Sequence, residues 1–280
     1  MTMVEKILEF ANKNGSIPVA GGAYHVLCVS AVLIVSFLVC VRLKNCGDKV
    51  FRRCVFVMWL SIFLFEIYKQ VIFNIHDISG GYVFRYNWAD LPFQLCSTPL
   101  YVLPFLAFLS DRPIRDFAAS YTMTFTLIAG VAVYLIPSTV FSSNVILNIH
   151  TMLHHGMQIV SGVFVAIWYR KRICFEFYLK GVSVFVIMLA IAVFLNTAFY
   201  EYLIETKIIS ASEEFNMFYI SPYQEHVMPV FRDFFAKLSP EDRPRIYFIG
   251  LSFAAAVTML CVKSLSYLGK IFDNIDHKCY

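Results

Sequence analysis

The sequence is poor in charged residues. Only 15% of its 280 residues are Asp, Glu, Lys or Arg, whereas a soluble domain usually carries about 25%. Hydrophobic residues make up 59% of the chain, and the mean hydropathy is +0.67. A soluble protein of this size could not bury so much apolar surface, because part of every fold must face water. The composition therefore excludes a soluble globular domain and indicates a membrane protein.

Several sequence signatures are also missing. The eight cysteines form no CxxC or CxxH pair, which argues against a disulfide framework. The chain has no glycine-rich phosphate loop, no internal repeat and no nucleic-acid signature, so we expect no nucleic-acid partner. Residues 1–22 contain four charged side chains and lack a long apolar core. We therefore expect no cleavable signal peptide.

Seven apolar stretches are long enough to cross a bilayer, which takes about 20 helical residues. The predicted spans are 23–42, 54–75, 91–109, 117–137, 149–169, 179–203 and 246–268. They form a single transmembrane domain over 23–268, preceded by an outside segment (1–22) and followed by a cytoplasmic tail (269–280). The predicted fold is all-α, a polytopic bundle of seven transmembrane helices.

Basic residues are distributed unevenly between the connections. Fourteen Lys and Arg follow spans one, three, five and seven, and three lie in the short segments on the opposite side. Because basic residues favour the cytoplasmic side, we predict an outside N-terminus and a cytoplasmic C-terminus. As a separate expectation, the membrane is a bacterial-type plasma membrane. The long outer loop 204–245 has apolar spacing near 227–238 that predicts a short amphipathic helix at the interface.

Polar side chains concentrate in the outer parts of four predicted spans. Ionisable groups inside a membrane are costly and usually face a bundle interior or a functional cavity. The candidates are Glu66, Asp90, Gln94, Cys96, His150, His154, His155 and Asn196. Since they lie at one depth on separate spans, we expect a shared cavity at the outer leaflet.

Each candidate also has a purely structural interpretation. Glu66 and Lys69 are three residues apart on a helix and can pair with each other. A lone cysteine such as Cys96 is usually a small apolar filler. Three histidines within six residues are harder to explain this way, because each buried imidazole needs polar partners.

Two chemistries and one non-enzymatic role fit these residues. Cys96 could be a nucleophile with a histidine base, which suits acyl transfer through a thioester and needs no cofactor or metal. Alternatively, His150 and His154 with Glu66 or Asp90 could bind Zn²⁺ in a membrane lipid hydrolase. The same polar cavity could instead bind or transport a small solute or lipid without catalysis.

Four short motifs of the sequence resemble, in their order along the chain, the motifs of a known family. They are "DLPFQLCSTPLYVLPFLAF", "HTMLHHG", "NMFYISP" and "PRIYFIG", and the resemblance extends over about residues 20–268. The chain resembles the YwaF-like integral membrane proteins, whose animal relatives include transmembrane protein 164. The resemblance implies a seven-span bundle and, in the animal branch, a phospholipid acyltransferase.

Carried over by position, the resemblance assigns roles to particular residues. Cys96 becomes the acyl-accepting nucleophile, and His155 or His154 becomes its base. Asn216 falls in the family's asparagine-containing outer loop. Separately from the resemblance, we expect Gln94, or the outer-facing backbone N–H groups at the start of the third span, to stabilise the oxyanion. The implied partners are membrane phospholipids, as acyl donor and acceptor.

Overall fold

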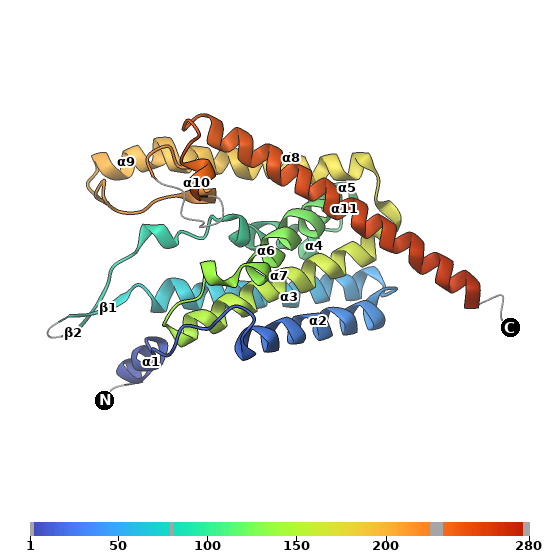
Figure 1. Cartoon of the computed structure of the whole chain (residues 1–280), viewed down its shortest axis with the longest axis horizontal. Helices are drawn as coiled ribbons and strands as arrows, with labels where there is room; N and C mark the ends of the chain where they lie inside the picture. Colours follow the sequence, from blue (N-terminus) through green and yellow to red (C-terminus); the bar gives the residue numbers. More distant parts are fainter. Residues whose placement is uncertain (1–2, 79–80, 225–231, 277–280) are drawn as a thin grey trace.

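The computed structural model describes residues 3–78, 81–224 and 232–276, and most of them are helical (Figure 1). The long helices lie side by side, and α7 packs against α2, α3 and α6. The α-helices are α1 (Met3–Ala11), α2 (Ala23–Leu43), α3 (Asp48–Ile72), α4 (Pro99–Phe108), α5 (Arg112–Tyr121), α6 (Leu127–Leu135), α7 (Val145–Tyr169), α8 (Phe175–Phe194), α9 (Tyr200–Glu205), α10 (Arg232–Phe235) and α11 (Asp242–Asp276). One antiparallel hairpin pairs β1 (Ile75–Ile78) with β2 (Gly81–Phe84) in the register Ile75 to Phe84.

Four helical segments of the described chain are long and apolar enough to cross a membrane. They are Ala23–Leu43, Arg112–Leu135, Phe175–Glu205 and Asp242–Ser264. The first and last of them turn large apolar side chains outward, since Leu33 is 63% exposed and Phe253 is 70% exposed. Water would penalise such surfaces, whereas lipid solvates them. The chain is therefore a multi-pass membrane protein.

Helices occupy most of each of six stretches predicted as spans. Four of these stretches coincide with α2, α3, α7 and α11. The other two are composite helices, each interrupted by a π-helical turn, at Thr122–Thr126 between α5 and α6 and at Leu195–Phe199 between α8 and α9. That the seven predicted stretches all cross the membrane stays a prediction.

The third predicted span, 91–109, is helical only in its second half. Residues 91–94 are not helical, η2 (Leu95–Ser97) is a single 3-10 turn, and α4 begins at Pro99. Proline suits the first helical position, because the amide hydrogen it lacks would be unpaired there. Our prediction of a helix starting at Leu91 was therefore wrong, because Pro92 and the extended backbone of Gln94 interrupt it.

A proline inside α4 has a specific partner that compensates for it. Pro104 has no amide hydrogen to give to the carbonyl of Leu100, four residues earlier. The indole nitrogen of Trp59 on α3 donates to that carbonyl at 3.0 Å. Within lipid an unpaired backbone carbonyl is expensive, so this bond both satisfies Leu100 and fixes α4 against α3.

The predicted outer loop and tail are partly outside the described residues. Of the amphipathic helix predicted near 227–238, residues 227–231 lie outside them, and 232–235 form the short helix α10. α11 continues to Asp276, beyond the predicted end of the last span at 268, and residues 277–280 of the predicted tail also lie outside the described part.

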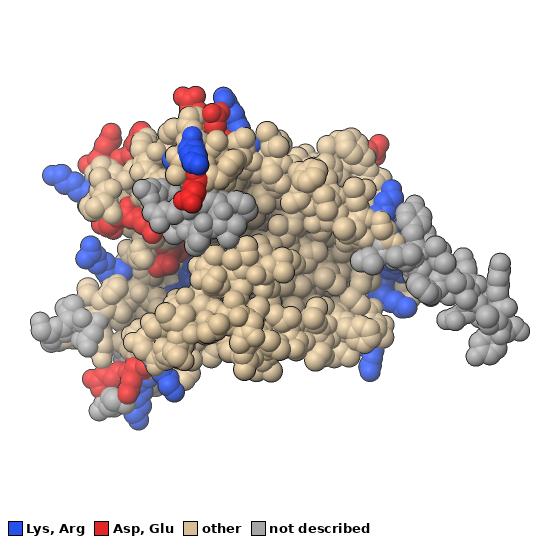
Figure 2. All heavy atoms as spheres, in the orientation of Figure 1, with Lys and Arg blue, Asp and Glu red and all other residues tan. Residues whose placement is uncertain are grey.

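Charged side chains gather at the two ends of the bundle on the face shown in Figure 2, with a broad uncharged band between them. At the end that carries the α2–α3 connection, Arg115 pairs with Asp48 at 2.7 Å. There Asp116 on α5 pairs with Lys180 at 3.1 Å and also with Arg172. These ion pairs tie α3, α5 and α8 together where the bundle meets polar surroundings.

Candidate functional site

The site begins with a carboxylate on the buried face of α3. Glu66 is 5% exposed, and its Oε1 accepts from Gln70 Nε2 at 2.7 Å and pairs with Lys69 Nζ at 3.0 Å. All three belong to one helical turn, where side chains three and four apart are neighbours. The predicted pairing of Glu66 with Lys69 is confirmed. Both contacts fall on one carboxylate oxygen, which leaves Oε2 for other partners.

α7 brings three histidines to the same region. His150 and His154 are four residues apart and share a helix face, with ring centroids 5.6 Å apart. His155 is turned away from that face and donates from Nδ1 to the carbonyl of Thr151 at 2.8 Å. All three rings are buried, with exposed fractions of 8% or less.

Two of the α7 side chains hold the backbone of Cys96. His154 Nε2 lies 3.1 Å from the Cys96 carbonyl oxygen, and Gln158 Nε2 lies 2.7 Å from it. A carbonyl oxygen only accepts, so both nitrogens donate. When the His154 ring is neutral, its other nitrogen, Nδ1, therefore carries a lone pair. His155 donates from Nδ1 to the Thr151 carbonyl, so its lone pair is on Nε2.

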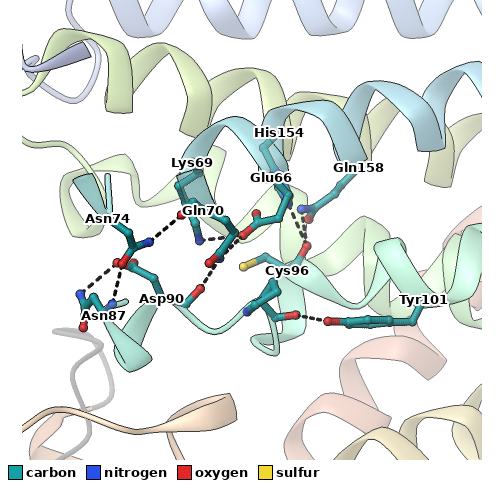
Figure 3. A network of polar contacts seen from close by, with 11 residues as sticks. Glu66, Lys69, Gln70, Asn74, Asn87, Asp90, Cys96, Tyr101, His154 and Gln158 are labelled. Carbon is teal, nitrogen blue, oxygen red and sulfur yellow. Dashed lines mark hydrogen bonds and ion pairs between the residues drawn. The ribbon is translucent and has the colours of Figure 1, made fainter. Parts of the chain in front are cut away.

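The thiol of Cys96 points into this polar network, on the side of Gln70 and Glu66 (Figure 3). Cys96 is a half-buried free cysteine in η2, directly before α4. Within the described part of the chain, His25, His76, His154 and His155 each bond a backbone carbonyl, and no histidine forms a hydrogen bond with the thiol. The structure thus brings Cys96 and His154 together through a backbone carbonyl, and the role of a histidine as base stays a prediction.

Asp90 lies at the outer rim of the network. Its Oδ2 accepts from Asn87 Nδ2 at 2.9 Å, and its backbone carbonyl accepts from Gln70 Nε2 (Figure 3). The carboxylate is therefore engaged with Asn87 and is not one of the groups beside His150 and His154. Of the two carboxylates considered from the sequence, Glu66 is the one next to the histidines.

The side chain of Gln94 hydrogen-bonds to the backbone of the segment that follows α9. Its Nε2 donates to the carbonyl of Asn216 at 2.7 Å, and its Oε1 accepts from the amide of Phe218 at 2.8 Å. The prediction that Gln94 stabilises an oxyanion therefore finds no support, because its amide already holds two backbone groups. The structure gives it a positioning role instead.

Asn196 and Asn216 complete the attachment of this segment. Asn196 exchanges two 2.7 Å hydrogen bonds with the backbone of Met217, and Asn216 Oδ1 accepts from the amide of Ser221 at 2.9 Å. We call residues 215–221 the outer strap. Its Phe218 stacks on Phe93, with centroids 5.8 Å apart, so the strap packs against the segment that carries Cys96.

The outer strap also places a tyrosine that the sequence did not single out. Burial and the nearby thiol of Cys96 raise the pKa of Tyr219. Phe218 and Tyr219 both have left-handed backbones, with φ of 56° and 57°. Non-glycine residues rarely adopt this conformation, and no residue type in "NMFYISP" signals it, so the strap's shape was not predictable.

An apolar cavity adjoins the histidines. It has a volume of about 840 Å³ and lies between α1, α3 and α7. Phe10, Leu64, Ile149 and Leu153 contribute to its apolar lining, and His150 forms part of its wall. A pocket of this size and composition suits a ligand that is mostly hydrocarbon.

Comparison with known proteins places the chain in a family. The model of the TMEM164 family matches residues 19–263, which is most of the chain and includes Cys96, Glu66 and the three histidines of α7. No curated protein and no solved structure matches the chain. Because the family match extends over far more than half of the sequence, the chain belongs to the TMEM164 family.

Proposed function

We propose that the chain crosses the membrane seven times, with its N-terminus outside and its C-terminus in the cytoplasm. Beside the four most apolar segments, α3 and α7 are 25 residues long and lie among them, and α4 packs on α3. In Figure 1 the two ends of the chain lie at opposite ends of the bundle, which an odd number of spans requires. The basic connections supply the orientation.

We further propose that the protein transfers acyl chains between membrane lipids through a thioester on Cys96. One observation carries this proposal: Cys96 is held at the start of α4 by His154 and Gln158, with its thiol directed into a polar network inside an otherwise apolar bundle. A filler cysteine needs no such surroundings. The thiolate is the reactive form of cysteine, so the proposed mechanism needs a base that takes the thiol proton.

The lipid substrate follows from the surroundings of the site. The cavity of about 840 Å³ between α1, α3 and α7 is lined mostly by apolar side chains and reaches His150. His150 and His154 lie one helical turn apart, and His154 bonds Cys96, so the cavity and the thiol belong to one region. An acyl chain in the cavity would place its ester near the polar network.

The proposed reaction has two halves. In the first, the base takes the Cys96 proton, the sulfur bonds to the ester carbonyl carbon of the donor lipid, and the lysolipid leaves with that proton. In the second, the base takes the proton of the acceptor hydroxyl, the acceptor oxygen bonds to the acyl carbon, and the thiol is regenerated. We assign the base to His155, with His154 as the alternative, since each has one lone-pair nitrogen.

A transfer assay tests this proposal. The purified chain in liposomes receives a phospholipid with a fluorescent acyl chain and a lysophospholipid acceptor, and the labelled product is measured. We expect Cys96→Ala to reduce transfer by at least about 100-fold, as removal of a nucleophile does. Cys54→Ala, at a half-buried cysteine of α3, is the matched control and should retain the wild-type rate. An unchanged rate in Cys96→Ala would refute the mechanism.

A further inference from the structure

Three buried metal-binding groups meet between α3 and α7. One ligand atom each from Glu66, His150 and His154 lies within 4.8 Å of the others. Their side chains are 5%, 8% and 3% exposed. Acyl transfer by Cys96 requires none of this geometry, because a thiol and a base suffice. The cluster therefore needs its own explanation.

Most of the unpaired atoms around this cluster are acceptors. Within the described residues, His154 Nδ1, both ring nitrogens of His150, Gln70 Oε1 and Gln158 Oε1 make no hydrogen bond of good geometry, although the His150 ring approaches the backbone of Phe65. In His154, Gln70 and Gln158 the Nε2 atom donates to a carbonyl or carboxylate oxygen. The unpaired atom of each side chain must therefore carry a lone pair.

Buried lone pairs without donors are costly. A cation is a partner that several converging lone pairs can share, whereas a single donor group can satisfy only one of them. Neutral His150 has one N–H, which can satisfy only one of these lone pairs. The chemistry of the unpaired atoms therefore points to a positively charged ligand.

Two of the three groups, His154 and Glu66, also make the second contacts that are typical of metal ligands. A metal-bound histidine usually donates its other ring N–H to a backbone carbonyl or a carboxylate, which fixes its orientation. His154 does so to the Cys96 carbonyl at 3.1 Å, and this leaves Nδ1 for a metal. Glu66 is oriented through Oε1 by Lys69 and Gln70, and this leaves Oε2.

We propose that Glu66, His150 and His154 bind one divalent transition metal ion, with Zn²⁺ the best match. Two imidazole nitrogens and one carboxylate oxygen form a recurring three-ligand set for zinc sites that keep a fourth position open. Ligands about 2.1 Å from a tetrahedral zinc lie roughly 3.4 Å apart. Binding would bring the ligand atoms closer together by at most about 1.4 Å, from the present limit of 4.8 Å, which small side-chain rotations allow.

This site goes beyond acyl transfer, and His155, the residue assigned as the base, is not one of its ligands, whereas the alternative base His154 is. Cys96 contributes its carbonyl to His154 and is not one of the three ligands. An open position on the metal could accept water or the carbonyl oxygen of an ester, both of which a bound Zn²⁺ activates. Metal binding and thioester formation are thus separate properties, and they can be measured separately.

Metal titration of the full chain tests the site. Purified protein in nanodiscs, stripped with chelator, is titrated with Co²⁺, whose visible absorption reports tetrahedral nitrogen and oxygen ligands, and with Zn²⁺ followed by elemental analysis. We expect about one ion per chain, and we expect His150→Ala and Glu66→Gln to lower the affinity at least about 10-fold. His25→Ala is the control, because His25 bonds the Tyr134 carbonyl instead.

The outcomes separate the two proposals. Wild-type protein that takes up neither ion, or binding that survives in both ligand variants, would overturn the metal site. If a ligand variant fails to fold, the wild-type titration decides alone. Cys96→Ala should still bind one ion, because its carbonyl remains. Loss of acyl transfer in Cys96→Ala with metal retained would leave both proposals standing, and metal uptake without any transfer would refute only the acyl-transfer proposal.

Discussion

The attachment of the outer strap by Asn196 gives the most quantitative prediction. Asn196 and Met217 are both fully buried, and the Asn196 amide pairs with both backbone groups of Met217 at 2.7 Å. In Asn196→Leu the side chain offers neither donor nor acceptor, so the Met217 amide loses its partner, whereas the Met217 carbonyl keeps the bond from the Ile220 amide at 3.3 Å. Each buried unpaired group costs about 1–3 kcal/mol. The free energy needed to open the strap should therefore fall by about 1–3 kcal/mol.

Backbone strain in the strap favours its opening once this attachment is lost. Phe218 and Tyr219 are held with φ of 56° and 57°, and a non-glycine residue in this conformation costs roughly 1–2 kcal/mol. Opening releases that strain in the variant and in the wild type alike. In the wild type, the hydrogen bonds from Asn196 and Gln94 keep the strap closed despite it.

Hydrogen exchange measured by mass spectrometry checks this prediction directly. A loss of about 1 kcal/mol corresponds to about a 5-fold faster exchange of the strap amides, so the exchange of peptides covering 215–221 should be at least that much faster in Asn196→Leu. Thr197→Val is the control, because the Thr197 hydroxyl bonds only the Val193 carbonyl of its own helix. Equal exchange in Asn196→Leu and wild type would refute the reasoning that this amide holds the strap.

Three further substitutions have expected outcomes. Gly181→Ala should lower the free energy of unfolding in detergent by about 1–3 kcal/mol, because the added Cβ would lie 2.5 Å from Ser120 Oγ. Gly250→Ala is the control and should leave the stability unchanged, because its Cβ would meet no neighbouring atom within 4 Å. Asp116→Asn should cost about 1–3 kcal/mol in the same assay, since it weakens ion pairs with two partly exposed cations. Gln94→Met should reduce lipid transfer and speed exchange of the strap without preventing thioester formation.

Much of the helical layout could be predicted because lipid imposes it. A chain in hydrocarbon must satisfy its backbone internally, so apolar stretches of about 20 residues become helices. α2 and α7 begin and end within about four residues of the predicted bounds for this reason. The start of α4 was predicted wrongly, because hydropathy does not indicate that Pro92 interrupts a helix. Nor does it indicate that Gln94 bonds the backbone of the outer strap.

The membership of the polar cluster could also be anticipated, but its contacts could not. Side chains that are costly in lipid must gather, and Glu66, His154 and Cys96 do lie in one network (Figure 3). Spacing along a helix predicted the pairing of Glu66 with Lys69. It could not predict that His154 bonds the carbonyl of Cys96, because that contact depends on how η2 meets α7.

The β-hairpin after α3 was not predicted either. β1 and β2 together are eight residues, joined across a short connection, and they follow directly on the polar end of α3. A search for spans treats such a segment as a plain loop. Its effect is to return the chain toward Asn87 and Asp90, whose contacts with α3 form the outer rim of the network.

The central claim is that Cys96 carries the acyl chain, and trapping that chain tests it most directly. The protein is incubated in liposomes with a phospholipid bearing an alkyne-tagged acyl chain and no acceptor, then denatured in acid and mapped by mass spectrometry. The account predicts an acyl adduct on the peptide containing Cys96 that neutral hydroxylamine removes and that Cys96→Ala lacks. Transfer of the tagged chain to an added acceptor, with no adduct on Cys96 at any time, would contradict the account.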